Sequence, residues 1–106
     1  MSIIQSIVDQ LIKESGKSRS YFLNGGCLIF ALLLKRVCGG QLRYLKQENH
    51  VILVVERSLY DATGNVTNKY KHSAYLKEDE LWIRKNLLRE LSYEKYIEEY
   101  IKPSET

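Results

Sequence analysis

A cysteine, a histidine and an aspartate stand at the ends of three successive segments of regular pattern. Cys27 follows the turn-forming triplet Asn-Gly-Gly and opens an apolar run that reaches Leu34. A thiol in the first turn of a helix feels the positive end of the helix dipole, which favours the nucleophilic thiolate. His50 heads an aliphatic run, and Asp61 comes eleven residues later. The spacing predicts a small thiol hydrolase or acyltransferase.

Each of the three residues has a role in this chemistry. His50 would take the proton of the Cys27 thiol and later protonate the leaving group. Asp61 would orient the imidazole and stabilise the imidazolium that forms. The backbone N–H of Cys27, at the start of the helix, is a candidate donor to the oxyanion.

Each residue also has a plainer interpretation. Cysteine is among the most buried residue types, so a small apolar side chain in the core is the default for both Cys27 and Cys38. His50 could be a core or strand-edge histidine, and Asp61 an acid beside a turn. Cys27 departs from the default because a Gly-Gly turn, a helix start and a downstream His and Asp coincide.

The elements that must position these residues can be predicted from the apolar pattern. Residues 3–14 repeat apolar side chains at three- and four-residue spacing, which predicts an amphipathic helix with Ser2 and Gln5 as a capping pair. The segment 16–26 is polar and predicts a loop. A second, almost wholly apolar helix is expected from Cys27 to Cys38, ended by two glycines.

Strands are expected after this helix. Residues 41–46 alternate weakly, 50–56 form an aliphatic run typical of a central strand covered on both faces, and 59–63 return antiparallel. A turn of two or three residues would bring Asp61 opposite Val51 or Ile52, close to His50.

The remainder of the chain predicts a polar loop over 65–73 and then helices. Residues 78–91 carry a helical apolar pattern, and Ser92 can cap a last helix rich in tyrosine. The tyrosine stripe predicts core contact, with a partner-binding surface as the alternative.

We therefore expect an α+β fold in one domain, residues 1–106. It would comprise an N-terminal helix (1–15), a core holding the Cys, His and Asp (20–66) and C-terminal helices (76–102). The Cys-bearing helix would be central, packed on a small antiparallel sheet and flanked by the terminal helices.

The order and placement of Cys27, His50 and Asp61 resemble the papain-like cysteine peptidase superfamily in its smallest forms. This superfamily includes cell-wall peptidases, amidases, transglutaminases and many phage or effector proteins. In it the Cys opens a central helix, the His begins a strand, and an Asp or Asn on the next strand orients the imidazole. The segments GGC, HVILVV and LYDATG match these three places, and the resemblance covers residues 20–66.

The chain departs from this family before the cysteine. Papain-like peptidases carry a Gln there that completes the oxyanion hole, whereas this sequence has Tyr21 and Asn24. Tyr21, Asn24 and Gly26 are therefore the candidates for a further oxyanion or substrate contact.

Composition argues against several other functions. The chain of 106 residues is 44% apolar and 27% charged, as in an ordinary globular domain. Its net charge of +3 is small and the basic residues are spread along the chain, so a nucleic-acid partner is not indicated. No apolar run is long enough to cross a bilayer, and no signal peptide is recognisable, so we expect a cytoplasmic protein without a membrane partner.

No metal or other cofactor is predicted. Cys27 and Cys38 would lie roughly 16 Å apart on one helix, which is too far for a disulfide or a shared zinc ion. Both are expected to be free thiols, and His72 is expected to be a solvated loop residue.

Two functions remain open. The first is a hydrolase or acyltransferase that acts on an amide or ester, in peptides, isopeptides or Gln side chains, through Cys27, His50 and Asp61. The second is a non-catalytic interaction protein on the same scaffold, for example a phage-encoded inhibitor that binds a host factor.

Overall fold

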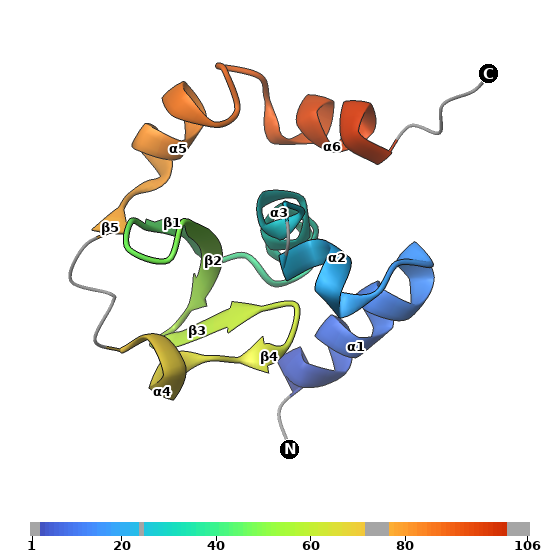
Figure 1. Cartoon of the computed structure of the whole chain (residues 1–106). Coiled ribbons are helices and arrows are strands. Elements are labelled where there is room, and N and C mark those ends of the chain that lie inside the picture. Colours follow the sequence, from blue (N-terminus) through green and yellow to red (C-terminus); the bar gives the residue numbers. More distant parts are fainter. Residues whose placement is uncertain (1–2, 24, 72–76, 102–106) are drawn as a thin grey trace.

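The structure, a computed structural model, describes residues 3–23, 25–71 and 77–101, and has an α+β fold (Figure 1). Within these residues the helices are α1 (Ile3–Ser15), α2 (Arg19–Leu23), α3 (Cys27–Cys38), α4 (Thr67–Tyr70), α5 (Glu80–Asn86) and α6 (Tyr93–Ile101). The strands are β1 (Gln41–Leu45), β2 (His50–Val55), β3 (Ser58–Asp61), β4 (Gly64–Asn65) and β5 (Lys77–Glu78).

The strands form one antiparallel sheet in the order β4-β3-β2-β1-β5, with β2 at its centre. Strands β2 and β3 are joined by a two-residue turn in which Glu56 has a φ of 58°. The pairing of Val55 with Ser58 and of Leu53 with Tyr60 fixes the register. Continued by one step, this register puts Asp61 across from Ile52, one of the two positions predicted for it.

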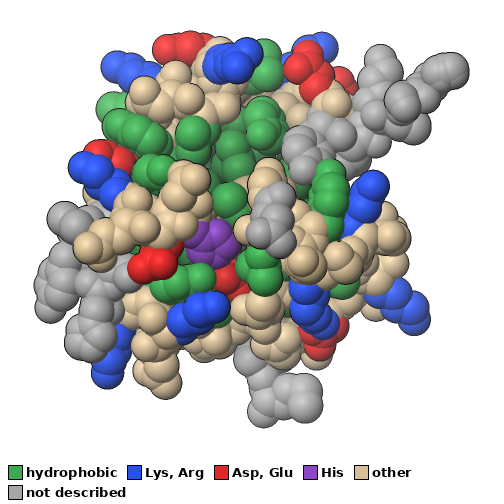
Figure 2. All heavy atoms as spheres, in the orientation of Figure 1, with side chains coloured by type: hydrophobic (Ala, Val, Ile, Leu, Met, Phe, Trp, Pro, Cys, Tyr) green, Lys and Arg blue, Asp and Glu red, His purple; other side chains and the backbone are tan. Residues whose placement is uncertain are grey.

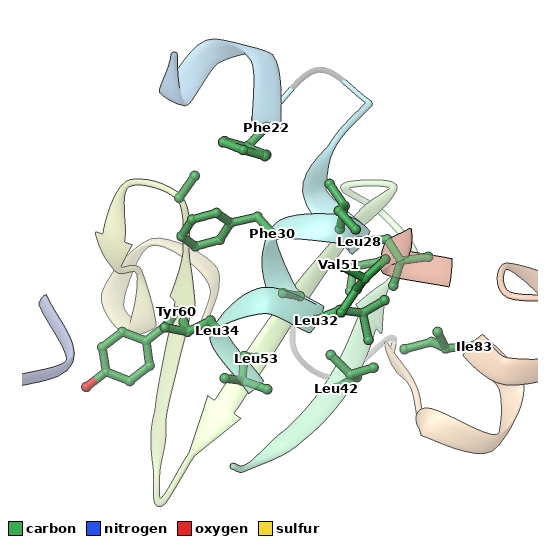
Figure 3. Packing of buried hydrophobic residues seen from close by; sticks show 14 of the residues in the cluster. Phe22, Leu28, Phe30, Leu32, Leu34, Leu42, Val51, Leu53, Tyr60 and Ile83 are labelled. Carbon is green, nitrogen blue, oxygen red and sulfur yellow. The ribbon is translucent and has the colours of Figure 1, made fainter. Parts of the chain in front are cut away.

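Helix α3 fills one face of the sheet with apolar side chains, because it is hydrophobic on nearly every side. Phe30, Leu32 and Leu34 are at most 2% exposed. They pack with Leu42, Val51 and Leu53 from the sheet in a single cluster (Figure 3). Alternate residues of β2 therefore carry the main core.

The opposite face of the sheet has a smaller core. Ile52 and Leu45 point to this side, where they pack with Val66 and with Tyr70 of α4. The predicted double-sided burial of β2 is confirmed for His50–Leu53, whereas Val54 and Val55 are only half-buried. Val66 and Tyr70, which cover this second face, lie in the segment 65–73 that was predicted to be a polar loop.

The remaining helices surround α3 and the edge of the sheet. Helix α1 contacts α3 and β4, α6 contacts α3, and α5 lies against β1. Trp82 of α5 stacks on Tyr44 of β1 with ring centroids 4.8 Å apart. The expectation that terminal helices flank the Cys-bearing helix is confirmed.

Several element predictions need correction. The segment 16–26 contains α2, and 65–73 contains α4, where loops were expected. The helix predicted over 78–91 is confined to Glu80–Asn86, and strands β4 and β5 were not foreseen. The remaining helices and strands agree with the predicted ones to within about two residues at each end, and Ser92 Oγ accepts the Lys95 N–H as predicted. The proposed cap at Ser2 lies outside the described residues.

In the part of the chain that the structure describes, no helix is both long enough and apolar enough to span a membrane.

Candidate active site

Two glycines with different tasks place Cys27 at the start of α3. Gly25 has a φ of 109°, a conformation that other residues adopt only with strain. Gly26 is buried, and a Cβ there would lie 3.1 Å from both the Phe22 Cα and the Tyr21 carbonyl oxygen. The Gly-Gly sequence therefore lets α2 pack directly against the turn that presents the thiol.

His50 and Asp61 form a buried hydrogen-bonded pair. The His50 Nε2 lies 2.9 Å from Asp61 Oδ2, and the two residues are only 6% and 4% exposed. The ring of Tyr70 packs against the imidazole, with centroids 5.5 Å apart. The hydrogen bond that the sequence only permitted is therefore present.

The second carboxylate oxygen of Asp61 is held by Thr63. Its Oδ1 accepts the Thr63 backbone N–H at 2.8 Å and the Thr63 hydroxyl at 2.6 Å. Three donors thus fix the carboxylate, which leaves it little freedom to rotate away from His50.

The Cys27 thiol is hydrogen-bonded to the His50 side chain. Because Nε2 faces Asp61, the other ring nitrogen, Nδ1, is the one available to the thiol. The Val51 backbone N–H also points at Cys27 Sγ, at 3.5 Å. The sulfur, the imidazole and the carboxylate therefore form one continuous chain of hydrogen bonds, brought together by α3, β2 and β3.

Each group in this chain has a shifted pKa. Burial raises the pKa of Cys27, but hydrogen bonds from His50, Val51 N–H and Leu28 N–H outweigh it, so the pKa lies below its ordinary value. Burial lowers the pKa of His50, but the bonds to Asp61 and Cys27 raise it to about 9. Burial raises the pKa of Asp61, but the bonds from His50 and Thr63 bring it below its usual range. The raised pKa of His50 favours the imidazolium at neutral pH, and the lowered pKa values of Cys27 and Asp61 reflect the hydrogen bonds and charge that His50 supplies to them.

Cys38 differs in its environment. It lies in the last turn of α3, and burial raises the pKa of its thiol. Both cysteines are free thiols, as predicted.

The candidate oxyanion residues have separate outcomes. Gly26 is the N-cap residue of α3, directly before Cys27. Tyr21 lies on α2, its ring edge-on to Phe22 and 4.9 Å from the Lys17 ammonium. Asn24 lies outside the described residues, as does His72. As the first residue of α3, Cys27 has a backbone N–H for which the helix supplies no acceptor.

Sequence reasoning missed Thr63, Tyr70 and Tyr96. Thr63 stood two residues from Asp61, so the tendency of Asp to bond the backbone two residues on was a usable signal. Tyr70 reaches the site through tertiary packing, and no local pattern marks it. Tyr96 belongs to the tyrosine stripe predicted for the last helix, but that stripe was not assigned to the site. Burial raises the pKa of Tyr96, and the negative charge of Cys27 raises it further.

No group of three or more His, Cys, Asp or Glu side chains within the described ranges is arranged to hold a metal ion.

The chain was compared with models of known protein families. The model of the Phage YunG-like protein family matches residues 2–102. The chain belongs to this family. No curated protein and no solved structure gives a significant match. The match spans the whole site, so Cys27, His50 and Asp61 all lie within the family's segment.

Proposed function

We propose that this protein of the Phage YunG-like family is a thiol-dependent hydrolase or acyltransferase that acts on an amide or ester. The observation that carries the proposal is the continuous chain of hydrogen bonds from Cys27 through His50 to Asp61. A buried imidazole with its pKa raised to about 9 holds a proton beside the sulfur at neutral pH. This supports a thiolate and imidazolium pair of the kind that papain-like enzymes use.

The reaction follows from these positions. The thiolate of Cys27 attacks the substrate carbonyl carbon, a C–S bond forms, and the carbonyl electron pair moves onto oxygen. The backbone N–H of Cys27 is suited to stabilise that oxygen. When the intermediate collapses, the amine or alcohol leaves with the proton from His50. The thioester then reacts with water or a second amine, whose proton returns to His50.

The substrate would be a peptide, an isopeptide or a Gln side chain. A catalytic thiol must remain reduced, which suits the cytoplasm as the place of action. A protein that acted by binding alone would have no need of a lowered thiol pKa.

The first test compares the two cysteines. Brief treatment with iodoacetamide at pH 7, followed by peptide mass spectrometry, should label Cys27 at least about tenfold faster than Cys38. The activated ester p-nitrophenyl acetate should acylate Cys27 and release p-nitrophenolate in a burst.

Three variants complete this test. Cys27→Ser should lose the burst, and His50→Ala should slow it by about 100-fold or more, because the base acts with the nucleophile. Cys38→Ser is the matched control and should keep the burst. Equal labelling of both thiols, or a biological effect that survives Cys27→Ser and His50→Ala, would favour the interaction protein instead.

A further inference from the structure

The turn that follows Asp61 is bound by an arginine from a distant part of the chain. Ala62 and Thr63 form this turn between β3 and β4, and Asp61 pairs with Gly64 across it. Arg19, the first residue of α2, donates from Nη1 to the Ala62 carbonyl at 2.7 Å. The bond joins residues that are 43 positions apart in the sequence.

The carbonyl that Arg19 binds and an N–H that Asp61 binds belong to the same peptide group. This peptide joins Ala62 to Thr63, and its N–H donates to Asp61 Oδ1 at 2.8 Å. Because a peptide group is planar, fixing the direction of its oxygen also fixes the direction of its N–H. The guanidinium charge also polarises the peptide, which strengthens the hydrogen bond that the N–H donates. Arg19 therefore acts on the carboxylate through one rigid group.

The hairpin itself does not hold this peptide. The hydrogen bond that closes a β-turn joins its first and fourth residues, so the central peptide group takes no part in it. The common turn types differ in the orientation of that group. Ala62 is only 1% exposed, so its carbonyl has little access to water and depends on a protein donor. The Arg19 side chain supplies that donor.

Arg19 is held in its own place by α1. Its Nη2 donates to Asp9 Oδ1 at 2.8 Å, and the same oxygen accepts from Gln5 Nε2 at 3.1 Å. Helix α2 packs on α3 and lies between α3 and α1 in Figure 1. Figure 2 shows basic and acidic side chains side by side at the lower right of this face, where Figure 1 places α1 and α2. The Arg19 side chain is 42% exposed, so it lies between solvent and the turn.

We infer that Arg19 is a positioning residue for the candidate active site: by holding the central peptide of this turn, it keeps the Asp61 carboxylate directed at His50. The inference rests on the proposed function, because it concerns the acid of that site. Without the guanidinium the peptide can rotate, and Asp61 Oδ1 then loses a donor. The carboxylate is then less often placed to bond His50, which makes the imidazolium and the Cys27 thiolate less favourable.

The charge of Arg19 has a smaller effect of opposite sign. A positive charge near His50 disfavours the imidazolium, so its removal alone would favour the thiolate. This charge is half-exposed and paired with Asp9, which weakens its action at a distance. The loss of orientation therefore decides the direction of the change.

The test combines Arg19→Met with Asp61→Asn. In the otherwise wild-type protein, Arg19→Met should slow alkylation of Cys27 by iodoacetamide at pH 7 by about three- to tenfold, the equivalent of one hydrogen bond. In the Asp61→Asn background the same change should slow it by less than about twofold, because the carboxylate through which Arg19 acts is absent. A purely structural effect of Arg19 on the fold would be the same in both backgrounds.

Asp9→Asn is the matched control. It removes the charge that pairs with Arg19 but keeps an oxygen that can accept from the guanidinium, so the alkylation rate should stay at the wild-type value. A wild-type rate for Arg19→Met, an equal loss in both backgrounds, or an equal loss in Asp9→Asn would overturn the inference. Arg19→Gln, which has a shorter and uncharged side chain, replaces Arg19→Met in both backgrounds if the latter fails to fold.

The outcome separates the two proposals. Equal alkylation of Cys27 and Cys38 in the wild-type protein would contradict the proposed function, and the role of Arg19 with it. Preferential alkylation of Cys27 that does not depend on Arg19 would contradict only the role of Arg19.

Discussion

Asp61 acts on Cys27 through the imidazole that lies between them. The carboxylate bonds one ring nitrogen of His50, which leaves the other ring nitrogen for the thiol. A proton on His50 is then stabilised from both sides, and the sulfur is favoured as an anion. Thr63 keeps the carboxylate in this orientation. Removal of the Asp61 carboxylate should therefore make the Cys27 thiolate less favourable.

Asp61→Asn should slow alkylation of Cys27 by iodoacetamide at pH 7 by about tenfold or more. The neutral amide stabilises imidazolium less, so the pKa of His50 falls and less thiolate is present. The alkylation rate of Cys27 should be measured as a function of pH, because Asp61→Asn also shifts the alkaline part of this pH profile. Asp9→Asn removes an exposed acid paired with Arg19 and should leave the profile unchanged. A wild-type profile for Asp61→Asn would show that the acid does not control the thiol.

At the scale of elements, the junction between α3 and β1 depends on two consecutive glycines. Gly39 ends the helix with a φ of 75° and donates its N–H to the Lys35 carbonyl at 2.8 Å. Gly40 has a φ of 94°, and a Cβ there would overlap the Val54 carbonyl oxygen of β2. The first glycine is needed for its conformation alone, and the second also for close approach to the central strand.

Alanine at these two positions should separate the two requirements. Gly39→Ala should lower the free energy of unfolding by about 1 to 2 kcal/mol, the cost of a positive φ, because nothing lies within 4 Å of the added Cβ. Gly40→Ala should cost about 3 kcal/mol or more, because strain and overlap with backbone combine. Urea unfolding measures both, and equal losses would exclude the overlap as a cause.

The elements that the sequence predicted correctly are those with long apolar patterns. Helix α3 and strand β2 are of this kind. Once β2 was predicted, a short turn after it was enough to place Asp61 near His50. Helices α2 and α4 have only five and four residues, too short to be stable alone, and they exist because Phe22 and Tyr70 are buried by distant residues. The apolar pattern of α5 continues into Leu87 and Leu88, but the positive φ at Arg89 and Glu90 turns the chain. The three chemical residues could thus be predicted, and the short helices that pack around them could not.

At the scale of the whole molecule, folding brings a histidine and a carboxylate out of water together. His50 and Asp61 are nearly inaccessible, so each ion depends on its partner for stability. The folded pKa of His50 is raised, so its contribution to stability is complete below about 6.5 and is lost as the pH rises through about 9. The folded pKa of Asp61 is lowered, so its contribution is present above about 3.9 and is lost as the pH falls through the lowered value.

The folded pKa of Cys27 is lowered, so its contribution to stability grows as the pH rises, opposite to that of His50. The test therefore removes this thiol. In Cys27→Ser, the pKa of His50 loses the part of its rise that comes from Cys27 and keeps the part that comes from Asp61. The free energy of unfolding should therefore still fall by about 1 kcal/mol as the pH rises above 6.5, because folded His50 keeps a proton that the unfolded chain releases. Adding His50→Ala should flatten this slope. Thermal or urea unfolding at a series of pH values measures it, and an equally steep fall without the histidine would assign the slope to other groups.

The stacking of Trp82 on Tyr44 has a practical consequence. The sequence contains a single tryptophan, and it lies where α5 meets β1. Its fluorescence emission therefore reports whether the C-terminal segment is docked on the sheet. Because the thiol lies elsewhere, in the first turn of α3, one optical signal and one chemical signal follow two different parts of this small protein.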